Sequence, residues 1–199
     1  MDQVHPYQAD SREWVLVSLA IVSVLLVWLL DVGLDSISFE PPWWISAPSF
    51  VGIYTLLYKV FDLHLWRLGL LRSLKLVEVP DLNGKWSGWV KSSHTQSTVA
   101  NPVSVYIRQS WSKIVFRLET EHSRSNSIAA AIRTDDLPYP EFVHLYVNEP
   151  KSTALDTMNI HKGTATLELK GTILEGEYYS GRGRREFGTL RLCRDEGPM

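Results

Sequence analysis

The feature that most constrains this chain is a pair of long uncharged segments near its N-terminus. Seventeen consecutive residues, Trp14 to Leu30, carry no charge, and eighteen more, Pro41 to Tyr58, follow after a short loop. A bilayer core of roughly 30 Å is spanned by about 17 to 25 apolar residues of helix, whereas a buried helix of a soluble protein seldom lacks charge for so long. The sequence therefore predicts a hairpin of two transmembrane helices, at about 14–30 and 43–61, within an N-terminal domain of residues 1–79.

The distribution of basic residues indicates the orientation of this hairpin. The loop at residues 31–40 has three acidic residues and no lysine or arginine, whereas four basic residues follow the second segment between residues 59 and 75. Because basic residues are enriched on the cytoplasmic side, we expect the loop outside and both termini in the cytoplasm. The leader before Trp14 is net acidic, so the first segment is expected to be a retained helix rather than a signal peptide. A helical linker is predicted over 62–79, since Pro80 ends it.

From Gly84 onward, short runs of alternating polar and apolar residues predict β-strands, each with one apolar face and one polar face that contacts solvent. Eight strands are predicted, at Lys85–Ser92, Val103–Trp111, Lys113–Glu121, Ser127–Thr134, Glu141–Asn148, Thr164–Lys170, Thr172–Ser180 and Glu186–Arg194. Most connections are short, so neighbouring strands should be antiparallel, and closing into a barrel removes the edges of the sheet. We therefore expect a membrane-anchored all-β protein, in which residues 80–199 form an eight-stranded antiparallel, lipocalin-like β-barrel. Such a lumen holds side chains or one small ligand.

The first predicted strand opens with Gly84-Lys85-Trp86. This Gly-x-Trp pattern resembles the opening of lipocalin-type barrels, in which the tryptophan plugs the closed end. The resemblance implies the same position for Trp86.

Charge, histidine spacing and motifs exclude several classes of function. The formal net charge of −2 is not that of a protein that coats long DNA or RNA. The six histidines and the single Cys193 lack metal-ligand spacing, and no nucleophile elbow, P-loop or zinc-protease motif occurs. We therefore expect no enzyme activity, no metal ion and no cofactor. A lone cysteine cannot form an internal disulfide, which favours a cytosolic C-terminal domain.

The most unusual local feature is a cluster of three arginines spaced by glycines within residues 181–188. Guanidinium groups beside glycines can grip phosphate through charge and bidentate hydrogen bonds, and neighbouring tyrosines can stack on a base. Tyr146 is predicted to face the lumen, because it shares a strand face with Phe142. The candidate ligand-binding residues are Arg182, Arg184, Arg185, Tyr178, Tyr146, Arg108 and Trp111. The alternative is that the arginines form a basic hairpin turn that keeps the domain soluble or touches anionic lipid.

The order of these elements resembles the two-transmembrane, β-strand-rich effectors of bacterial cyclic-oligonucleotide antiphage signalling (CBASS). The resemblance covers the whole chain in architecture, and its motifs are Leu82-Asn83-Gly84-Lys85-Trp86-Ser87-Gly88 and the Gly-x-Tyr-Tyr-Ser-Gly of Gly176–Gly181. It implies that a synthase makes a cyclic dinucleotide during phage infection, that the barrel binds it, and that the transmembrane segments then disrupt the inner membrane and cause abortive infection. The expected partners are therefore the cyclic dinucleotide, the lipid bilayer and, once ligand is bound, further copies of the chain.

Two other functions remain open at this point. A membrane-tethered, lipocalin-like carrier of a small apolar molecule would have an apolar lumen and would not need the three arginines. A barrel that only scaffolds a membrane complex would have a filled core without a pocket.

Overall fold

The computed structural model describes residues 12–35, 43–93, 100–134, 137–154, 159–181 and 186–195. These residues form two compact units. One contains the described residues up to Glu78 together with Ser110–Ser112, and the other contains the rest of the chain from Val79 onward.

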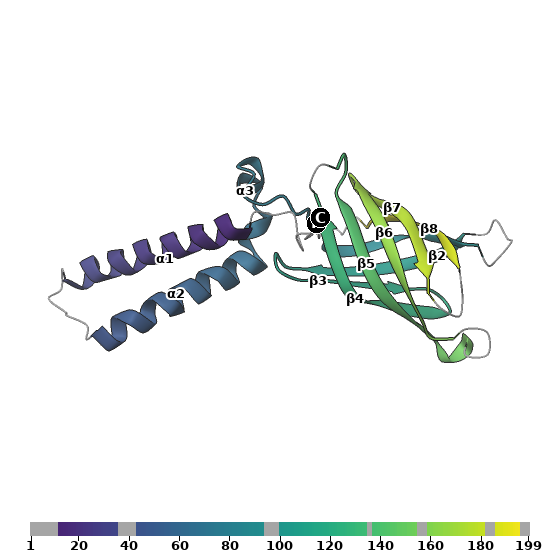
Figure 1. The fold of residues 1–199 in the computed structure, drawn as a ribbon, viewed down its shortest axis with the longest axis horizontal. Coiled ribbons are helices and arrows are strands. Elements are labelled where there is room, and N and C mark those ends of the chain that lie inside the picture. The colour runs from purple at the N-terminus through teal and green to yellow at the C-terminus, as the bar shows by residue number, and fades with distance from the viewer. Residues whose placement is uncertain are drawn as a thin grey trace, which may run out of the picture. The chain divides into compact units, whose positions relative to one another are not determined.

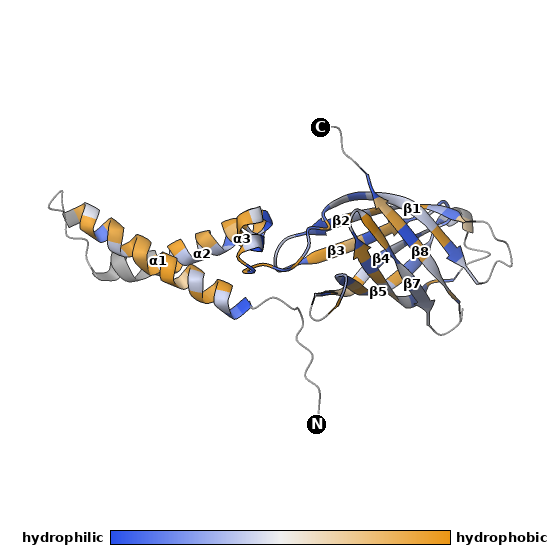
Figure 2. Ribbon diagram, turned by 90° about the horizontal axis from the view of Figure 1, so that it is seen from above, coloured by the Kyte–Doolittle hydropathy of each residue, from blue (hydrophilic) through white to orange (hydrophobic). Residues whose placement is uncertain are grey.

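Two helices, α1 (Arg12–Asp35) and α2 (Trp43–Leu63), lie side by side in the first unit (Figure 1). Apolar residues extend along most of α1 (Figure 2), and large side chains such as Ile21 and Leu25 are more than half exposed. Among the described residues, the segment Arg12–Leu34 is the one helix long and apolar enough to cross a membrane, with a mean hydropathy of 2.7. So much exposed apolar surface is stable in lipid and not in water.

The predicted helical linker is much shorter than expected. Only a 3₁₀ turn, η1 (Leu65–Arg67), and one short helix, α3 (Gly69–Ser73), follow α2. Lys75 has a left-handed backbone with φ of 54°, and the Leu76 amide donates to the Leu71 carbonyl over 2.9 Å. This arrangement is a common end of a helix, and residues 77–83 form neither helix nor strand.

All eight predicted strands are confirmed, and they form a closed barrel in which each strand pairs with its neighbours along the chain and β8 pairs with β1 (Figure 1). The strands are β1 (Gly84–Ser92), β2 (Asn101–Gln109), β3 (Ile114–Glu119), β4 (Ser123–Arg133), β5 (Glu141–Pro150), β6 (His161–Lys170), β7 (Ile173–Ser180) and β8 (Phe187–Arg194). Every pairing is antiparallel, as the short connections predict.

One end of the barrel is closed by Trp86, which is 1 % exposed. Its indole Nε1 donates to the Leu82 carbonyl over 2.9 Å, and the Arg194 guanidinium lies over the ring, 5.1 Å from the centroid. Arg194 also donates to the carbonyls of Asp81 and Asn83, over 2.6 and 2.8 Å. Trp86 therefore has the plugging position that its Gly-x-Trp pattern implies.

Two glycines of the motif stretches are needed because strands approach closely there. A Cβ on Gly88 of β1 would overlap the Arg191 carbonyl oxygen and come within 2.9 Å of the Leu192 Cα on β8. A Cβ on Gly176 of β7 would overlap the Thr166 carbonyl oxygen on β6. Both glycines thus have a structural role in closing the barrel.

The seam between β3 and β4 is the shortest in the barrel. Only Arg117, Leu118 and Glu119 of β3 are in register with β4, whereas β4 and β5 share ten pairs along their length. A bulge in β4 at residues 127–129 coincides with the end of the β3 pairing. A bulge re-aims a strand, so β4 leaves β3 here and continues along β5 alone.

Candidate ligand-binding site

A cavity of about 200 Å³ lies inside the barrel and receives side chains from all eight strands. Its lining residues are Val90, Ser92, Asn101, Pro102, Phe116, Leu118, Thr120, Glu121, His122, Ser123, Ser125, His144, Tyr146, Asn148, His161, Ala165, Tyr178, Ser180, Glu186 and Leu190. Trp86 is not among them, and the lining positions lie toward the strand ends remote from it. The cavity therefore lies toward the end of the barrel opposite Trp86, and this end is called the mouth below.

Strand β5 points a graded set of side chains into the barrel, and three of them, His144, Tyr146 and Asn148, line the cavity. Phe142, His144, Tyr146 and Asn148 alternate inward along it and are all buried. The His144 ring contacts three other rings: its centroid lies 5.0 Å from that of Phe142, on which it stacks, and 4.4 Å and 5.9 Å from the tilted rings of Phe116 and Tyr146. The surroundings thus change from an apolar floor at Phe142 to a polar mouth at Asn148.

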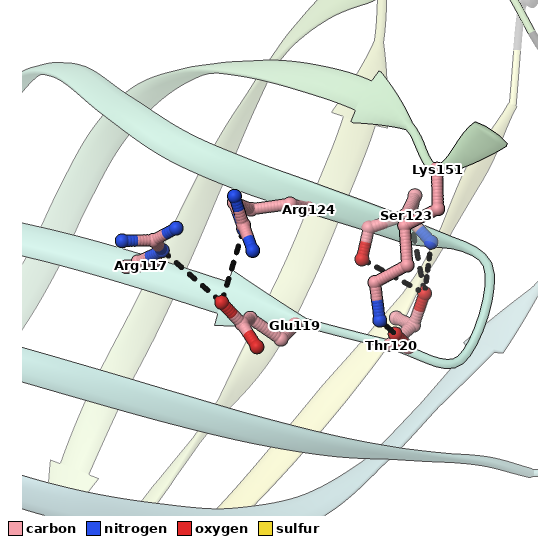
Figure 3. Close-up of polar contacts among 6 residues, drawn as sticks. All are labelled: Arg117, Glu119, Thr120, Ser123, Arg124 and Lys151. Atoms are coloured by element: carbon pink, nitrogen blue, oxygen red, sulfur yellow. Dashed lines mark hydrogen bonds and ion pairs between the residues drawn. The ribbon is translucent and has the colours of Figure 1, made fainter.

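The mouth is ordered by hydrogen bonds between its polar groups. The Ser125 hydroxyl donates to Asn148 Oδ1 over 2.8 Å, and the Ser92 hydroxyl donates to Glu186 Oε2 over 3.2 Å. In the β3–β4 turn, the Ser123 amide donates to Thr120 Oγ1 over 2.9 Å (Figure 3). Such bonds hold the polar side chains in place before a ligand arrives.

Three basic residues, Lys151, Arg117 and Arg124, lie near this turn (Figure 3). Lys151 Nζ donates to the Thr120 carbonyl over 2.6 Å. On the neighbouring strands, the Glu119 carboxylate oxygen Oε1 lies 3.2 Å from Arg117 Nε and 3.0 Å from Arg124 Nε. These arginines are half-exposed and are not lining residues, so they do not supply charge inside the cavity.

The described lining carries carboxylates and no lysine or arginine. Glu121 and Glu186 are its acidic members, and Glu186 is 7 % exposed. Within the part of the chain that the structure describes, no group of three or more His, Cys, Asp or Glu residues could hold a metal ion. The lining therefore favours neutral polar and aromatic groups over a deeply placed anion.

The structure brings two of the predicted site residues together and places two elsewhere. Tyr146 and Tyr178 both line the cavity. Arg108 is exposed on the outer face of β2, in register with Val115 of β3, because its neighbours in the strand take the inward positions. Trp111 belongs to the helical unit, where its ring lies 5.0 Å from that of Phe61. Arg108 and Trp111 are therefore outside the cavity.

The three predicted arginines, Arg182, Arg184 and Arg185, lie outside the described residues. The residues on either side of them are informative, because Ser180 and Glu186 both line the cavity. The Ser180 amide donates to the Glu186 carbonyl over 2.7 Å. The chain thus leaves for the arginine segment, and returns from it, at the mouth.

Sequence reasoning missed His144, Asn148 and Ser180 as lining residues. The alternation that predicts an inward Tyr146 also places His144 and Asn148 on the same face of β5. That pattern was a sufficient signal for both, whereas Ser180 ends its strand and gave no comparable signal.

His144 is a buried polar group without a hydrogen bond at one ring nitrogen. The residue is 4 % exposed, and its Nδ1 has no partner among the described residues. Burial disfavours the charged form and lowers the pKa of His144 from 6.5 to about 4. The imidazole is therefore neutral at cellular pH.

Acidification from pH 7 to pH 5 should cost the barrel about 2 kcal/mol through His144 alone. The pKa of about 4 in the folded state lies below the ordinary 6.5 of the unfolded chain, so protonation favours unfolding and stability falls as pH drops through that window. Urea unfolding at both pH values, on wild type and His144→Phe, measures this difference. The variant should lose this part of the pH dependence, while His122→Phe, at a side chain 61 % exposed, should keep it. Equal pH dependence in wild type and His144→Phe would contradict the assignment.

Comparison with known proteins places the chain in a family. Residues 77–194 match the family model described as "Cap15, cyclic dinucleotide receptor domain", and residues 13–67 match "Cap15, TM helices". The chain belongs to the Cap15 family. Its cavity lies within the region that matches the Cap15 receptor domain, and all of α1 after Arg12 lies within the region that matches the Cap15 transmembrane helices.

Two curated Cap15 relatives, both named CD-NTase-associated protein 15, are similar over most of the chain. The protein from Yersinia aleksiciae is 32 % identical over 184 residues, which cover 90 % of this chain and 85 % of the relative. The protein from Staphylococcus schleiferi is 26 % identical over 150 residues, which cover 75 % of this chain and 79 % of the relative. The resemblance to membrane-anchored β-barrel effectors of CBASS is thereby confirmed, together with the predicted fold.

Proposed function

We propose that this protein is the membrane effector of a CBASS antiviral system, activated by a cyclic dinucleotide that binds in the barrel. The observation that carries the proposal is a preformed cavity, polar at its mouth, inside the region that matches a cyclic dinucleotide receptor domain. The same chain carries the exposed apolar helix α1 in a region that matches transmembrane helices. A sensor and a membrane element on one chain are the two parts that such an effector needs.

The ligand is proposed to be held by aromatic residues of the cavity lining and by the arginines of the segment between Ser180 and Glu186. Tyr146 and Tyr178 line the cavity and offer rings on which a base stacks. Arg182, Arg184 and Arg185 are proposed to bind the phosphates through charge-assisted, bidentate hydrogen bonds. We leave Arg108 and Trp111 out of this set because both lie outside the cavity. No catalytic step is needed, since binding alone is the signal.

The membrane part is proposed to be a hairpin in the bacterial inner membrane, with α1 and α2 as two spans. Both termini and the barrel are proposed to lie in the cytoplasm, and the acidic loop and the basic residues after α2 support this orientation. A ligand changes the state of the protein only if it binds the active form better than the resting form. Ligand binding is proposed to favour a homo-oligomer of the barrel, which gathers the hairpins until they disrupt the bilayer and the infected cell dies.

The full-length protein reconstituted in dye-loaded liposomes tests this function. A panel of cyclic dinucleotides is added from the barrel side, and dye release is followed while calorimetry on the detergent-solubilised protein gives Kd. We expect binding and release with at least one member of the panel and no release without ligand. Release without ligand, or absence of binding across the panel, would contradict the proposal; binding of fatty acids or retinoids instead would support the apolar carrier.

Removing the three arginines should lower affinity at least about 100-fold, since each charged hydrogen bond contributes about 1.5–3 kcal/mol. The variant Arg182→Ala, Arg184→Ala, Arg185→Ala is compared with Arg108→Ala, Lys113→Ala, Arg133→Ala. The second variant loses the same charge from exposed positions outside the cavity lining. Calorimetry should give a near wild-type Kd for this control. Equal loss in both variants would mean that general charge, and not the arginine segment, attracts the ligand.

A further inference from the structure

The cavity is too small for a whole cyclic dinucleotide. Its volume of about 200 Å³ lies below the range of about 300–1,000 Å³ found for pockets that enclose a drug-sized ligand. A cyclic dinucleotide has two bases, two sugars and two phosphates. One nucleobase is the part of it that matches both the size and the planar, aromatic character of this space.

The walls of the cavity fit a flat heteroaromatic ring. Phe116, His144, Tyr146 and Tyr178 present rings to it, and Ala165 and Leu190 complete its apolar part. Each base has a π-face that stacks on aromatic side chains, and such stacking contributes about 1–3 kcal/mol per base. A sugar or a phosphate would gain no comparable contact here.

Two buried polar atoms of lining residues have no hydrogen-bond partner among the described residues, and a side-chain rotation is needed to bring either of them to a ligand. They are Nδ1 of His144 and Oγ of Ser180. They project from β5 and β7, on either side of β6, where Ala165 is in register with His144 and Gly163 with Ser180. An unpaired buried polar group lowers stability, so a ligand group that pairs with it regains that free energy on binding.

The charges around the cavity favour a neutral group in its depth. Glu121 and Glu186 line it, and no lysine or arginine does so among the described residues. A phosphate drawn inside would have to pass these two carboxylates at the mouth and would find no cationic side chain among the described lining residues, whereas a neutral base needs none. The proposed phosphate-binding arginines follow Ser180 and precede Glu186 in the sequence, and these two flanking residues line the cavity.

We infer that the cavity takes one nucleobase of the cyclic dinucleotide, that His144 reads that base through its unpaired Nδ1, and that both phosphates and the second base stay at the mouth or outside it. This inference rests on the proposed function. It goes further by identifying the part of the ligand that is recognised inside the cavity. His144 acts as a specificity-determining residue, because a base that cannot pair with its ring nitrogen leaves that buried atom unsatisfied.

The neutral state of His144 supports this role. Burial lowers its pKa to about 4, so between pH 6 and 8 the ring carries one donor and one acceptor and no charge. The titratable groups that share the cavity with it are Glu121, His122, Tyr146, His161, Tyr178 and Glu186. A neutral imidazole pairs with the edge of a base without attracting a phosphate.

Mixed-base ligands test the insertion of a single base. Calorimetry on the full-length protein in detergent compares the best symmetric ligand of a panel with the mixed ligand that keeps one of its two bases and with the symmetric ligand that keeps neither. The probes are cyclic di-GMP, cyclic di-AMP, cyclic di-UMP and their mixed counterparts. If one base is inserted, the mixed ligand should lose only about twofold in affinity, from the loss of one of two equivalent orientations, and the ligand with neither base should lose at least about tenfold.

Variants at His144 test the residue that reads the base. His144→Phe keeps an aromatic ring and removes the nitrogen, so affinity for the best ligand should fall about 10- to 100-fold and the preference among bases should shrink. His144→Asn places a hydrogen-bonding atom close to the position of Nδ1 and should restore part of the preference. Leu145→Phe, on the same strand and 37 % exposed, is the control that should bind like wild type. Thermal unfolding without ligand should give His144→Phe a melting temperature equal to or above that of wild type.

Several outcomes would overturn the inference. One is a mixed ligand that binds as weakly as the ligand with neither preferred base, because both bases would then be recognised equally. Another is His144→Phe with an unchanged Kd and an unchanged order of preference. Failure of the wild-type protein to bind any member of the panel is a different result, since it would overturn the proposed function itself.

Discussion

Replacing Trp86 with alanine should lower the free energy of unfolding of the barrel by about 3–5 kcal/mol, the usual cost of truncating a large buried aromatic side chain. Trp86 is 1 % exposed, and its Nε1 bonds to the Leu82 carbonyl. The segment that it holds is also fixed from the barrel side, because the Gln109 side chain accepts from the Leu82 amide over 2.8 Å. Truncation would leave a cavity at the closed end and an Arg194 guanidinium without its aromatic neighbour.

Denaturant unfolding of the full-length protein in detergent measures this loss. The matched control is Trp89→Ala, three positions along the same strand. Trp89 is partly exposed on the outside of the barrel, where Lys91 Nζ lies over its ring at 5.0 Å. Its replacement should cost only about 1 kcal/mol, the contribution of an exposed cation–π contact. Similar losses for Trp86 and Trp89 would show that Trp86 has no special part in closing the barrel.

Replacing Gly88 with alanine should prevent a stable barrel, with a loss of more than about 4 kcal/mol. The added Cβ would overlap the Arg191 carbonyl oxygen, which is backbone and cannot move aside as a flexible side chain does. Relief requires β1 to separate from β8, and this is the pairing that closes the barrel. Both strands would then expose an unpaired edge, which also promotes aggregation.

The yield of monodisperse protein and its amide hydrogen exchange measure the effect of Gly88→Ala. Gly69→Ala adds the same methyl group at the start of α3, where nothing lies within 4 Å of the added Cβ. This control should be as stable as wild type. A folded Gly88→Ala protein with the exchange protection of wild type would contradict the steric role of Gly88.

Much of the fold could be predicted from sequence because its signals are local. Alternation of apolar and polar residues found every strand, and a charge-free stretch found α1. The linker was predicted wrongly as a longer helix, because its leucine-rich composition favours a helix. No residue pattern there predicts the left-handed backbone of Lys75. Helix propensity is a weak preference that such a turn overrides.

The site could be predicted only in part, because whether a side chain points into or out of the barrel depends on how all the strands pair. Tyr146 follows from strand parity, but the same parity was not extended to His144, which resembled any other scattered histidine. Trp111 was predicted as a strand residue, whereas the chain turns at Ser110–Ser112 and its indole packs on Phe61. Tertiary packing between residues far apart in the sequence sets the position of Trp111, and no pattern along the strand encodes it.

The short seam between β3 and β4 gives the barrel a preferred direction of deformation. Seven of its eight seams have six or more pairs in register, and this one has three. A change in circumference that opens this seam breaks fewer backbone hydrogen bonds than the same change at any other. Thr120 and Ser123, which belong to the mouth, sit in the turn that joins these two strands. The seam that opens most easily is therefore next to residues of the mouth. A ligand that binds at the mouth acts on the part of the barrel that deforms at the lowest cost.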